Sequence, residues 1–367
     1  MVRFTCSQNQ SMPTSSSPSS RSMAGKSLEN SETGLYASFN KERTSMREWF
    51  TPLEVIITTL CVALLTVILL PGMLVARDSA REQSCQDSLR QLGTAFLEYE
   101  KVHGGLPPRR SGFNDGNAYG GWGGFILPHL LTDNQATAYD TRFDFFDPRN
   151  KQIVETQLPV FLCPASPAER FVQIQSQAST KSLNPNKETV YTCKAAAVDF
   201  ITSNGVQMAR SGYGINAMGK NGRIGNQRQP MTDNQDLPLS KVTDGLSNTL
   251  LLIEQAGRPA AWYNREKQPG DGQFGMSPNA RGAWAGWGSI SFGAVNPETG
   301  QRPPRGDSTD CSVNCNNWLG IYGFHNEGGN VLFCDGSVRL IGKKLDPLTF
   351  AYLTIRDDGH LIQHDDF

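Results

Sequence analysis

"VIITTLCVALLTVILLPGMLVA" runs from Val55 to Ala76 and contains 22 residues without a charged side chain. A helix rises about 1.5 Å per residue, so one of this length spans the roughly 30 Å hydrocarbon core of a bilayer. The segment is longer than the apolar region of an ordinary signal peptide, and about fifty residues precede it. We therefore expect a membrane-spanning segment over residues 55–76, with a buried core helix as the alternative.

The helical pattern continues after Ala76 in "RDSAREQSCQDSLRQLGTAFLEYEKVHGGLPP". Apolar side chains recur there at spacings of four and three: Cys85, Leu89, Leu92, Phe96 and Tyr99. This is one apolar stripe on an otherwise charged helix. Paired glycines and prolines then end the pattern after residue 103. We expect a single long helix whose first half lies in lipid and whose second half packs on a globular domain.

The rest of the chain indicates short strands joined by loops. Charged residues make up only 19%, whereas the chain has 36 glycines and 21 prolines, which is unusual for a helical bundle. We expect strands within six segments: 120–130, 158–164, 191–205, 211–219, 249–257 and 286–295. The predicted fold class is α+β, with a long pilin-like N-terminal helix packed on a β-rich, mainly antiparallel C-terminal domain.

These patterns divide the chain into three parts. Residues 1–49 are Ser-rich and are predicted to be a disordered tail or leader. Residues 50–105 form the long helix, and residues 106–367 form the β-rich domain with a C-terminal hairpin at 330–341. The net charge of −1 provides no basic field for nucleic acid, so we expect no nucleic-acid partner.

The hairpin lies in "FHNEGGNVLFCDGSVRLI", Phe324 to Ile341. Asp335-Gly336 between two apolar runs favours a two-residue type I′ turn, which pairs Cys334 with Ser337 and Leu332 with Arg339. Val331, Phe333, Val338 and Leu340 then share one apolar face. His325 and Asp335 are placed at opposite ends of the strand, so we expect neither a catalytic pair nor a large effect of His325→Ala.

Six cysteines follow the apolar segment and are candidates for disulfides in an oxidising space outside the cytoplasm. They are Cys85, Cys163, Cys193, Cys311, Cys315 and Cys334. Six cysteines allow fifteen pairings, and the sequence does not choose among them. "CSVNC" resembles half of a metal site, but no second cysteine pair has matching spacing. We therefore expect no metal and no cofactor.

The segment "WFTPLEV", Trp49 to Val55, resembles a prepilin processing site, in which a Gly precedes a Phe-Thr-Leu-x-Glu run. Phe50, Thr51 and Glu54 match that pattern, whereas Trp49 stands in place of Gly. His325, Asp335 and Gly336 also resemble the H-X9-DG signature of a large bacterial family of prepilin-like proteins of unknown function. The resemblance covers residues 50–341.

The resemblance implies a membrane-anchored, non-enzymatic pseudopilin-like protein, a structural component of a type II secretion or type IV pilus-like system. The implied partners are the membrane, a prepilin peptidase, and pilin-like subunits or further copies of the chain that contact its N-terminal helix. The N-terminus would be cytoplasmic and the C-terminal domain extracytoplasmic. Glu54 would pair with the new amine of Phe50 in a neighbouring subunit, or would be solvated among lipid headgroups.

Two alternatives remain for the function. Trp122, Trp284 and Trp287 lie among glycines and could stack on sugar rings, although packing against backbone also explains them. A membrane-anchored carbohydrate- or surface-binding module is therefore the second hypothesis. An anchored hydrolase that uses His325 and Asp335 is the third, but no Ser or Cys nucleophile motif accompanies these residues.

Overall fold

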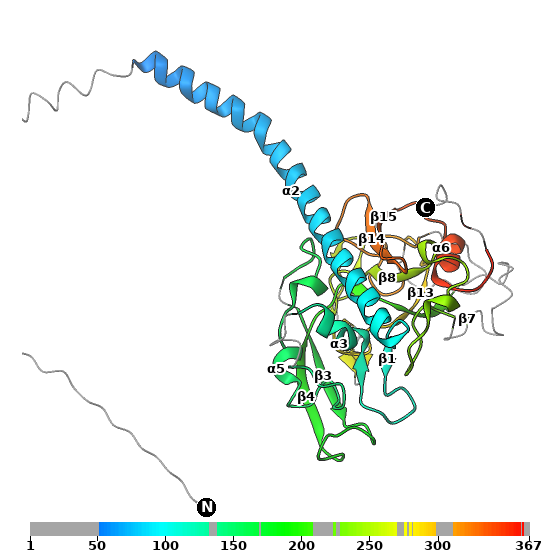
Figure 1. Ribbon diagram of the computed structural model, residues 1–367. Helices are drawn as coiled ribbons and strands as arrows, with labels where there is room; N and C mark the ends of the chain where they lie inside the picture. Colours follow the sequence, from blue (N-terminus) through cyan, green and yellow to red (C-terminus); the bar gives the residue numbers. More distant parts are fainter. Residues whose placement is uncertain are drawn as a thin grey trace, which may run out of the picture. The chain divides into compact units, whose positions relative to one another are not determined.

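The computed structural model describes residues 51–131, 138–168, 170–207, 223–224, 228–269, 275–276, 279–280, 282–298, 311–360 and 362 of the 367. Among these residues the chain forms two compact units, one ending at Leu70 and one beginning at Pro71. A single helix, α2 (Pro52–His103), contributes to both units (Figure 1). Trp49 and Phe50 of the processing motif lie outside the described residues, as does the predicted strand segment 211–219.

Helix α2 begins at a capping box. The Thr51 backbone N–H donates to Glu54 Oε2 at 2.8 Å, and the Glu54 N–H donates to Thr51 Oγ1 at 3.3 Å. These reciprocal bonds satisfy backbone donors that a helix start leaves free. Pro52 occupies the first helical position, where its missing N–H costs nothing. The helix ends where Gly104 takes φ 78° and its N–H donates to Glu100 O.

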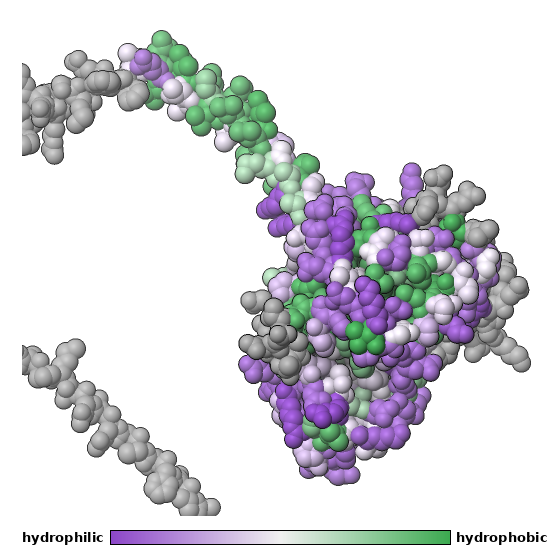
Figure 2. All heavy atoms as spheres, viewed as in Figure 1, coloured by the Kyte–Doolittle hydropathy of each residue, from purple (hydrophilic) through white to green (hydrophobic). Residues whose placement is uncertain are grey.

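The apolar half of α2 is exposed along its length in the described structure (Figure 2). Among the described residues, α2 is the one helix long and apolar enough to cross a membrane. Because exposed apolar side chains are stable in lipid and costly in water, this finding supports a membrane-anchored protein.

The second half of α2 packs on the β-rich domain through the predicted stripe. Cys85, Leu89, Leu92 and Phe96 are all fully buried, and Tyr99 is nearly so. The helix lies close to the sheet at Gly93, where a Cβ atom would lie 2.8 Å from Leu332 Cδ1. The stripe prediction is therefore confirmed.

The central sheet has four antiparallel strands in the order β15-β14-β8-β5, of which Figure 1 labels β15, β14 and β8. Their bounds are β5 (Phe200–Ile201), β8 (Leu250–Glu254), β14 (Gly328–Phe333) and β15 (Val338–Gly342). A second sheet has the order β13-β6-β7, and its β13–β6 pair is parallel. Its strands are β6 (Ser203–Gln207), β7 (Arg223–Ile224) and β13 (Ile290–Gly293). The mainly antiparallel α+β class is confirmed.

Smaller elements surround these sheets. The two-stranded pairs are β1 (Arg110–Ser111) with β2 (Gly120–Gly121), β3 (Phe171–Gln177) with β4 (Val190–Ala196), β9 (Trp262–Tyr263) with β10 (Glu266–Lys267), and β11 (Gly275–Met276) with β12 (Asn279–Ala280). The short helices are α3 (Trp122–Ile126), α5 (Lys151–Val154) and α6 (Pro347–Thr354). Single 3-10 turns are η1 (Leu127–His129), η2 (Pro159–Phe161), η3 (Leu239–Lys241) and η4 (Leu246–Asn248).

Two of the predicted strand segments contain mainly helical turns. Segment 120–130 contributes only β2 to a sheet and then forms α3 and η1, and segment 158–164 contains η2. In both, a proline lies in the first positions of a 3-10 turn, at Pro128 and Pro159. The prediction was wrong because a short buried apolar run has no periodicity that separates strand from helix.

The predicted hairpin exists, but its register differs by one residue. Leu332 pairs with Val338 and Val331 with Arg339. The Gly336 N–H donates to Phe333 O, and the Phe333 N–H donates to Ser337 O. Only Gly336 of the turn has positive φ, at 86°. The loop therefore has three residues and a bulge at Gly336 in place of the predicted type I′ turn.

The one-residue shift changes the composition of the hairpin's faces. Leu332 now lies on the face of Val338, whereas Val331 and Phe333 lie on the face of Arg339. The Arg339 guanidinium accordingly lies 4.5 Å from the centre of the Phe333 ring. Because β14 is a central strand and buried on both faces, apolar residues on either face satisfy the core, and hydrophobicity alone does not select the register.

Candidate functional site

Four side chains from distant parts of the sequence meet in the interior of the second unit. Cys85 comes from α2, Cys163 follows η2, Glu254 ends β8, and His325 precedes β14. One ligand atom from each lies within 4.8 Å of the others. All four residues are buried, and His325, the most exposed, retains only 4% of its accessible surface. We call these four residues the His325 cluster.

His325 contacts two other members of the cluster. Its Nε2 atom lies 3.3 Å from Cys163 Sγ and 3.3 Å from Glu254 Oε1. Burial lowers the pKa of His325, but its contacts with the Cys163 thiol and the Glu254 carboxylate raise the pKa by more, to about 10. Burial raises the pKa of the Cys85 thiol well above its usual value. These surroundings therefore favour the charged form of the His325 imidazole and the neutral form of the Cys85 thiol.

The Glu254 carboxylate is held on one side only. Its Oε2 atom accepts from the Asn330 backbone N–H at 2.9 Å and from Asn330 Nδ2 at 3.1 Å. Its Oε1 atom, which faces His325, is buried and accepts no regular hydrogen bond from the described residues. The sheet thus fixes the carboxylate and directs one oxygen into the cluster.

Cys163 is positioned by a second polar network. Its backbone N–H donates to Asp199 Oδ2 at 2.9 Å, and Ser166 Oγ donates to the same oxygen. Arg170 forms a buried ion pair with Asp199 at 2.7 Å. The loop that carries the thiol is therefore fixed by charged hydrogen bonds, which are stronger than neutral ones.

His325 and Asp335 do not come together. Asp335 is exposed in the turn, and its Oδ1 accepts from the Ser337 N–H, whereas His325 lies in the buried cluster. The prediction that they lie at opposite ends of β14 is confirmed. The expectation that His325→Ala has a mild effect needs revision, because this change would leave the buried Glu254 carboxylate without its cationic neighbour.

One disulfide is present among the described residues, between Cys311 and Cys315. The "CSVNC" segment thus forms a covalent loop and not half of a metal site. The other four candidate cysteines, Cys85, Cys163, Cys193 and Cys334, are buried free thiols.

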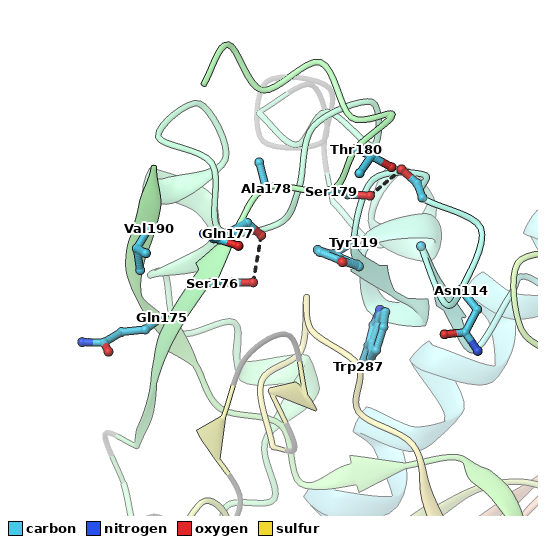
Figure 3. Close-up of a pocket in the computed structure, with 12 residues that line it drawn as sticks. Asn114, Tyr119, Gln175, Ser176, Gln177, Ala178, Ser179, Thr180, Val190 and Trp287 are labelled. Carbon is cyan, nitrogen blue, oxygen red and sulfur yellow. Dashed lines mark hydrogen bonds between the residues drawn. The ribbon is translucent and has the colours of Figure 1, made fainter. Parts of the chain in front are cut away.

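The three tryptophans proposed for sugar stacking differ in whether they line a cavity. Trp122, Trp284 and Trp287 are all buried; Trp284 stacks on Phe161 with ring centroids 5.4 Å apart, and Trp287 Nε1 donates to Ser111 O at 2.7 Å. Trp287 and Tyr119 line a cavity of about 760 Å³ together with Asn114 and residues 175–180 (Figure 3). Of the three tryptophans proposed for sugar stacking, only Trp287 lines this cavity.

Sequence reasoning missed Cys85, Cys163 and Glu254 as neighbours of His325. The four residues lie in four separate segments of the chain, so no ligand spacing could reveal them. A second histidine at ligand spacing or a paired Cys-x-x-Cys motif is the usual local signal, and neither accompanies these residues in the sequence.

Comparison with known proteins places the chain in a family. No curated protein and no solved structure matches it. The matching family model begins at residue 75 and ends at residue 348, so it includes the whole His325 cluster and the hairpin but not the motif at residues 49–54. The chain belongs to the family described as "Protein of unknown function (DUF1559)".

Proposed function

We propose that this protein is a membrane-anchored, non-enzymatic pseudopilin-like subunit of a type II secretion or type IV pilus-like assembly. The observation that carries the proposal is the continuity of α2, which joins an exposed apolar half to a half buried against a β-rich domain. A helix that served only as a membrane anchor would not need to continue unbroken from the exposed apolar half into the half that packs on the domain. The prepilin-like motif at residues 49–54 and the H-X9-DG resemblance at residues 325–336 add to this support.

The N-terminal motif has a further use in this proposal. In the isolated chain, Glu54 caps its own helix through Thr51. In an assembly, the same carboxylate would exchange this bond for the charged amine of a neighbouring Phe50, a stronger interaction in lipid. The disulfide at Cys311–Cys315 supports an extracytoplasmic location for the C-terminal domain.

N-terminal sequencing of full-length protein, co-expressed with a prepilin peptidase and extracted from membranes, tests the proposal. Processed protein should begin at Phe50, and Trp49→Gly should raise the processed fraction because the peptidase favours a small residue there. Wild-type processing in full yield would show that Trp49 does not hinder cleavage. Absence of processing in both proteins, together with no cross-linking between α2 helices of neighbouring copies, would contradict the pseudopilin-like function.

A carbohydrate- or surface-binding module is the second candidate, and the cavity beside Trp287 favours it. Tyr119 and Trp287, which keeps 7% of its accessible surface, line this cavity together with the polar residues Asn114, Gln177 and Ser179. Trp287→Ala should then abolish retention on a glycan array. Trp284→Ala serves as the comparison, because Trp284 does not line this cavity and its loss affects packing alone.

A further inference from the structure

The arrangement around His325 poses a hydrogen-bonding problem. Nε2 faces two groups at 3.3 Å, the Cys163 sulfur and Glu254 Oε1. A ring nitrogen has only one proton or one lone pair to direct, so it cannot form a strong bond to both. The buried Glu254 Oε1 consequently accepts no regular hydrogen bond within the described structure, which is costly for a carboxylate.

We propose that Cys85, Cys163, Glu254 and His325 form a structural zinc site. A tetrahedral ion with Zn–S bonds of about 2.3 Å and Zn–N or Zn–O bonds of about 2.0–2.2 Å separates its ligand atoms by about 3.3–3.8 Å. The two distances at His325 match the lower end of this range, and all four atoms lie within 4.8 Å of one another, so binding would draw the most widely spaced atoms inward by up to about 1 Å. One ion would satisfy Nε2 and Oε1 at the same time.

The ligand types select zinc over calcium or magnesium. Two thiolates and an imidazole are soft or borderline donors, whereas calcium and magnesium prefer a shell of oxygens. Four protein ligands complete a tetrahedron and leave no position for substrate, which is the arrangement of structural and not catalytic zinc. The site is therefore compatible with a protein that performs no chemistry.

The surroundings hold the ligands in place before an ion binds. Asn330 fixes the outer oxygen of Glu254, and Asp199 fixes the backbone of Cys163. Such outer contacts orient metal ligands and strengthen binding. His325 also lines a cavity of about 240 Å³ together with Asp78, Glu82 and Glu327, and with Arg81, which forms an ion pair with Asp78 at 3.8 Å. Acidic side chains outnumber the one arginine in this lining, which favours the approach of a cation.

The site would join separate parts of the fold. Cys85 lies on α2, and the other three ligands come from the β-rich domain. Zinc would therefore clamp the buried half of the long helix onto the domain. In an oxidising space it would also protect two neighbouring thiols from oxidation to a disulfide.

Metal analysis of the full-length protein, extracted in detergent and desalted, tests the proposal. Wild-type protein should contain about one zinc ion per chain, as a closed tetrahedral site requires. Glu254→Gln and Cys163→Ser should each lose most of this zinc. Cys193→Ser removes a buried thiol outside the cluster and should retain all of it. A chelator should lower the melting temperature of wild-type protein but not that of Cys163→Ser.

A second measurement keeps the test independent of whether the variants fold. Wild-type protein reconstituted with cobalt should show the intense thiolate-to-cobalt absorption band of a tetrahedral site with cysteine ligands. Zinc-free wild-type protein whose peptide map links Cys85 to Cys163 by a disulfide would overturn the proposal. Undiminished zinc in both ligand variants would also overturn it.

Discussion

Gly336 shows how one residue determines the turn between β14 and β15. Its φ of 86° lies in a region that side chains with a Cβ atom rarely adopt. A Cβ atom there would also lie 3.2 Å from Leu97 Cδ1 on α2. The position therefore requires glycine both for the backbone conformation and for the packing of the helix.

We expect Gly336→Val to lower the free energy of unfolding by about 1–3 kcal/mol, because a β-branched residue is strained at positive φ. Urea unfolding followed by circular dichroism measures this change. Gly342→Val is the matched control, since Gly342 lies in β15 with ordinary φ and no atom within 4 Å of its Cβ position. Equal effects of the two substitutions would show that strain at Gly336 is unimportant.

Asp233 holds two arginines in the interior. Its carboxylate forms ion pairs with Arg109 at 2.6 Å and with Arg110 at 2.7 Å, and the Arg109 side chain is fully buried. Burial raises the pKa of Asp233, but the two arginines lower the pKa by more, so its net value is below the usual one. The ionised form therefore stabilises the fold.

We expect Asp233→Asn to lower the free energy of unfolding by about 3–5 kcal/mol, because the substitution removes the carboxylate that balances the charge of a buried guanidinium. Stability from a lowered carboxyl pKa is complete above the unfolded pKa of about 3.9 and is lost as the pH falls through the folded pKa. The difference in the free energy of unfolding between wild type and Asp233→Asn, measured by urea unfolding, should thus be constant at neutral pH and should shrink below about pH 4. Asp140→Asn, which removes a surface pair with Arg142, should have a much smaller effect. A stability difference between wild type and Asp233→Asn that stays the same well below about pH 4 would contradict this account.

At the scale of elements, the contact between α2 and the hairpin depends on Gly93. Its Cβ position lies 2.8 Å from Leu332 Cδ1 and 3.4 Å from the Gly336 backbone, so helix and turn approach more closely than a larger residue permits. The apolar stripe packs α2 on the sheet, and the missing side chain at Gly93 allows the short distance between helix and turn.

Gly93→Leu should destabilise the domain by about 1–3 kcal/mol, since overpacking displaces the helix or the turn. Loss of protection from hydrogen exchange in β14 and β15 would locate the effect. Gly72→Leu, on the same helix, has nothing within 4 Å of its Cβ position and should leave that protection unchanged. Equal protection in Gly93→Leu and wild type would show that the contact tolerates a large side chain.

At the scale of the whole molecule, we expect the C-terminal domain to face away from the cytoplasm. The Cys311–Cys315 disulfide motivates this prediction, because disulfides persist in oxidising compartments. Val190→Cys creates a thiol at a position that is 56% exposed on β4. In cells that lack a prepilin peptidase, so that the chain keeps residues 1–49, a membrane-impermeant maleimide should label this residue before lysis, whereas the native Cys6 should react only after lysis. The reverse pattern would reverse the orientation.

The sequence by itself determined the features that depend on neighbours along the chain. The uncharged run at 55–76 predicted the exposed apolar half of α2, and the spacing from Cys85 to Tyr99 predicted its buried stripe. Asp335-Gly336 predicted a hairpin at the correct place. Each of these signals comes from local periodicity or turn chemistry, which requires no knowledge of distant contacts.

Only the tertiary structure decided the register of that hairpin and the neighbours of His325. A strand buried on both faces accepts either register, and the observed register accompanies the bulge at Gly336, which packs against Leu97 of α2. The His325 cluster brings together four segments that no sequence spacing connects. Its formation depends on how α2, β8 and the chain before β14 pack around one core, and side chains far apart in sequence meet only when that core is complete.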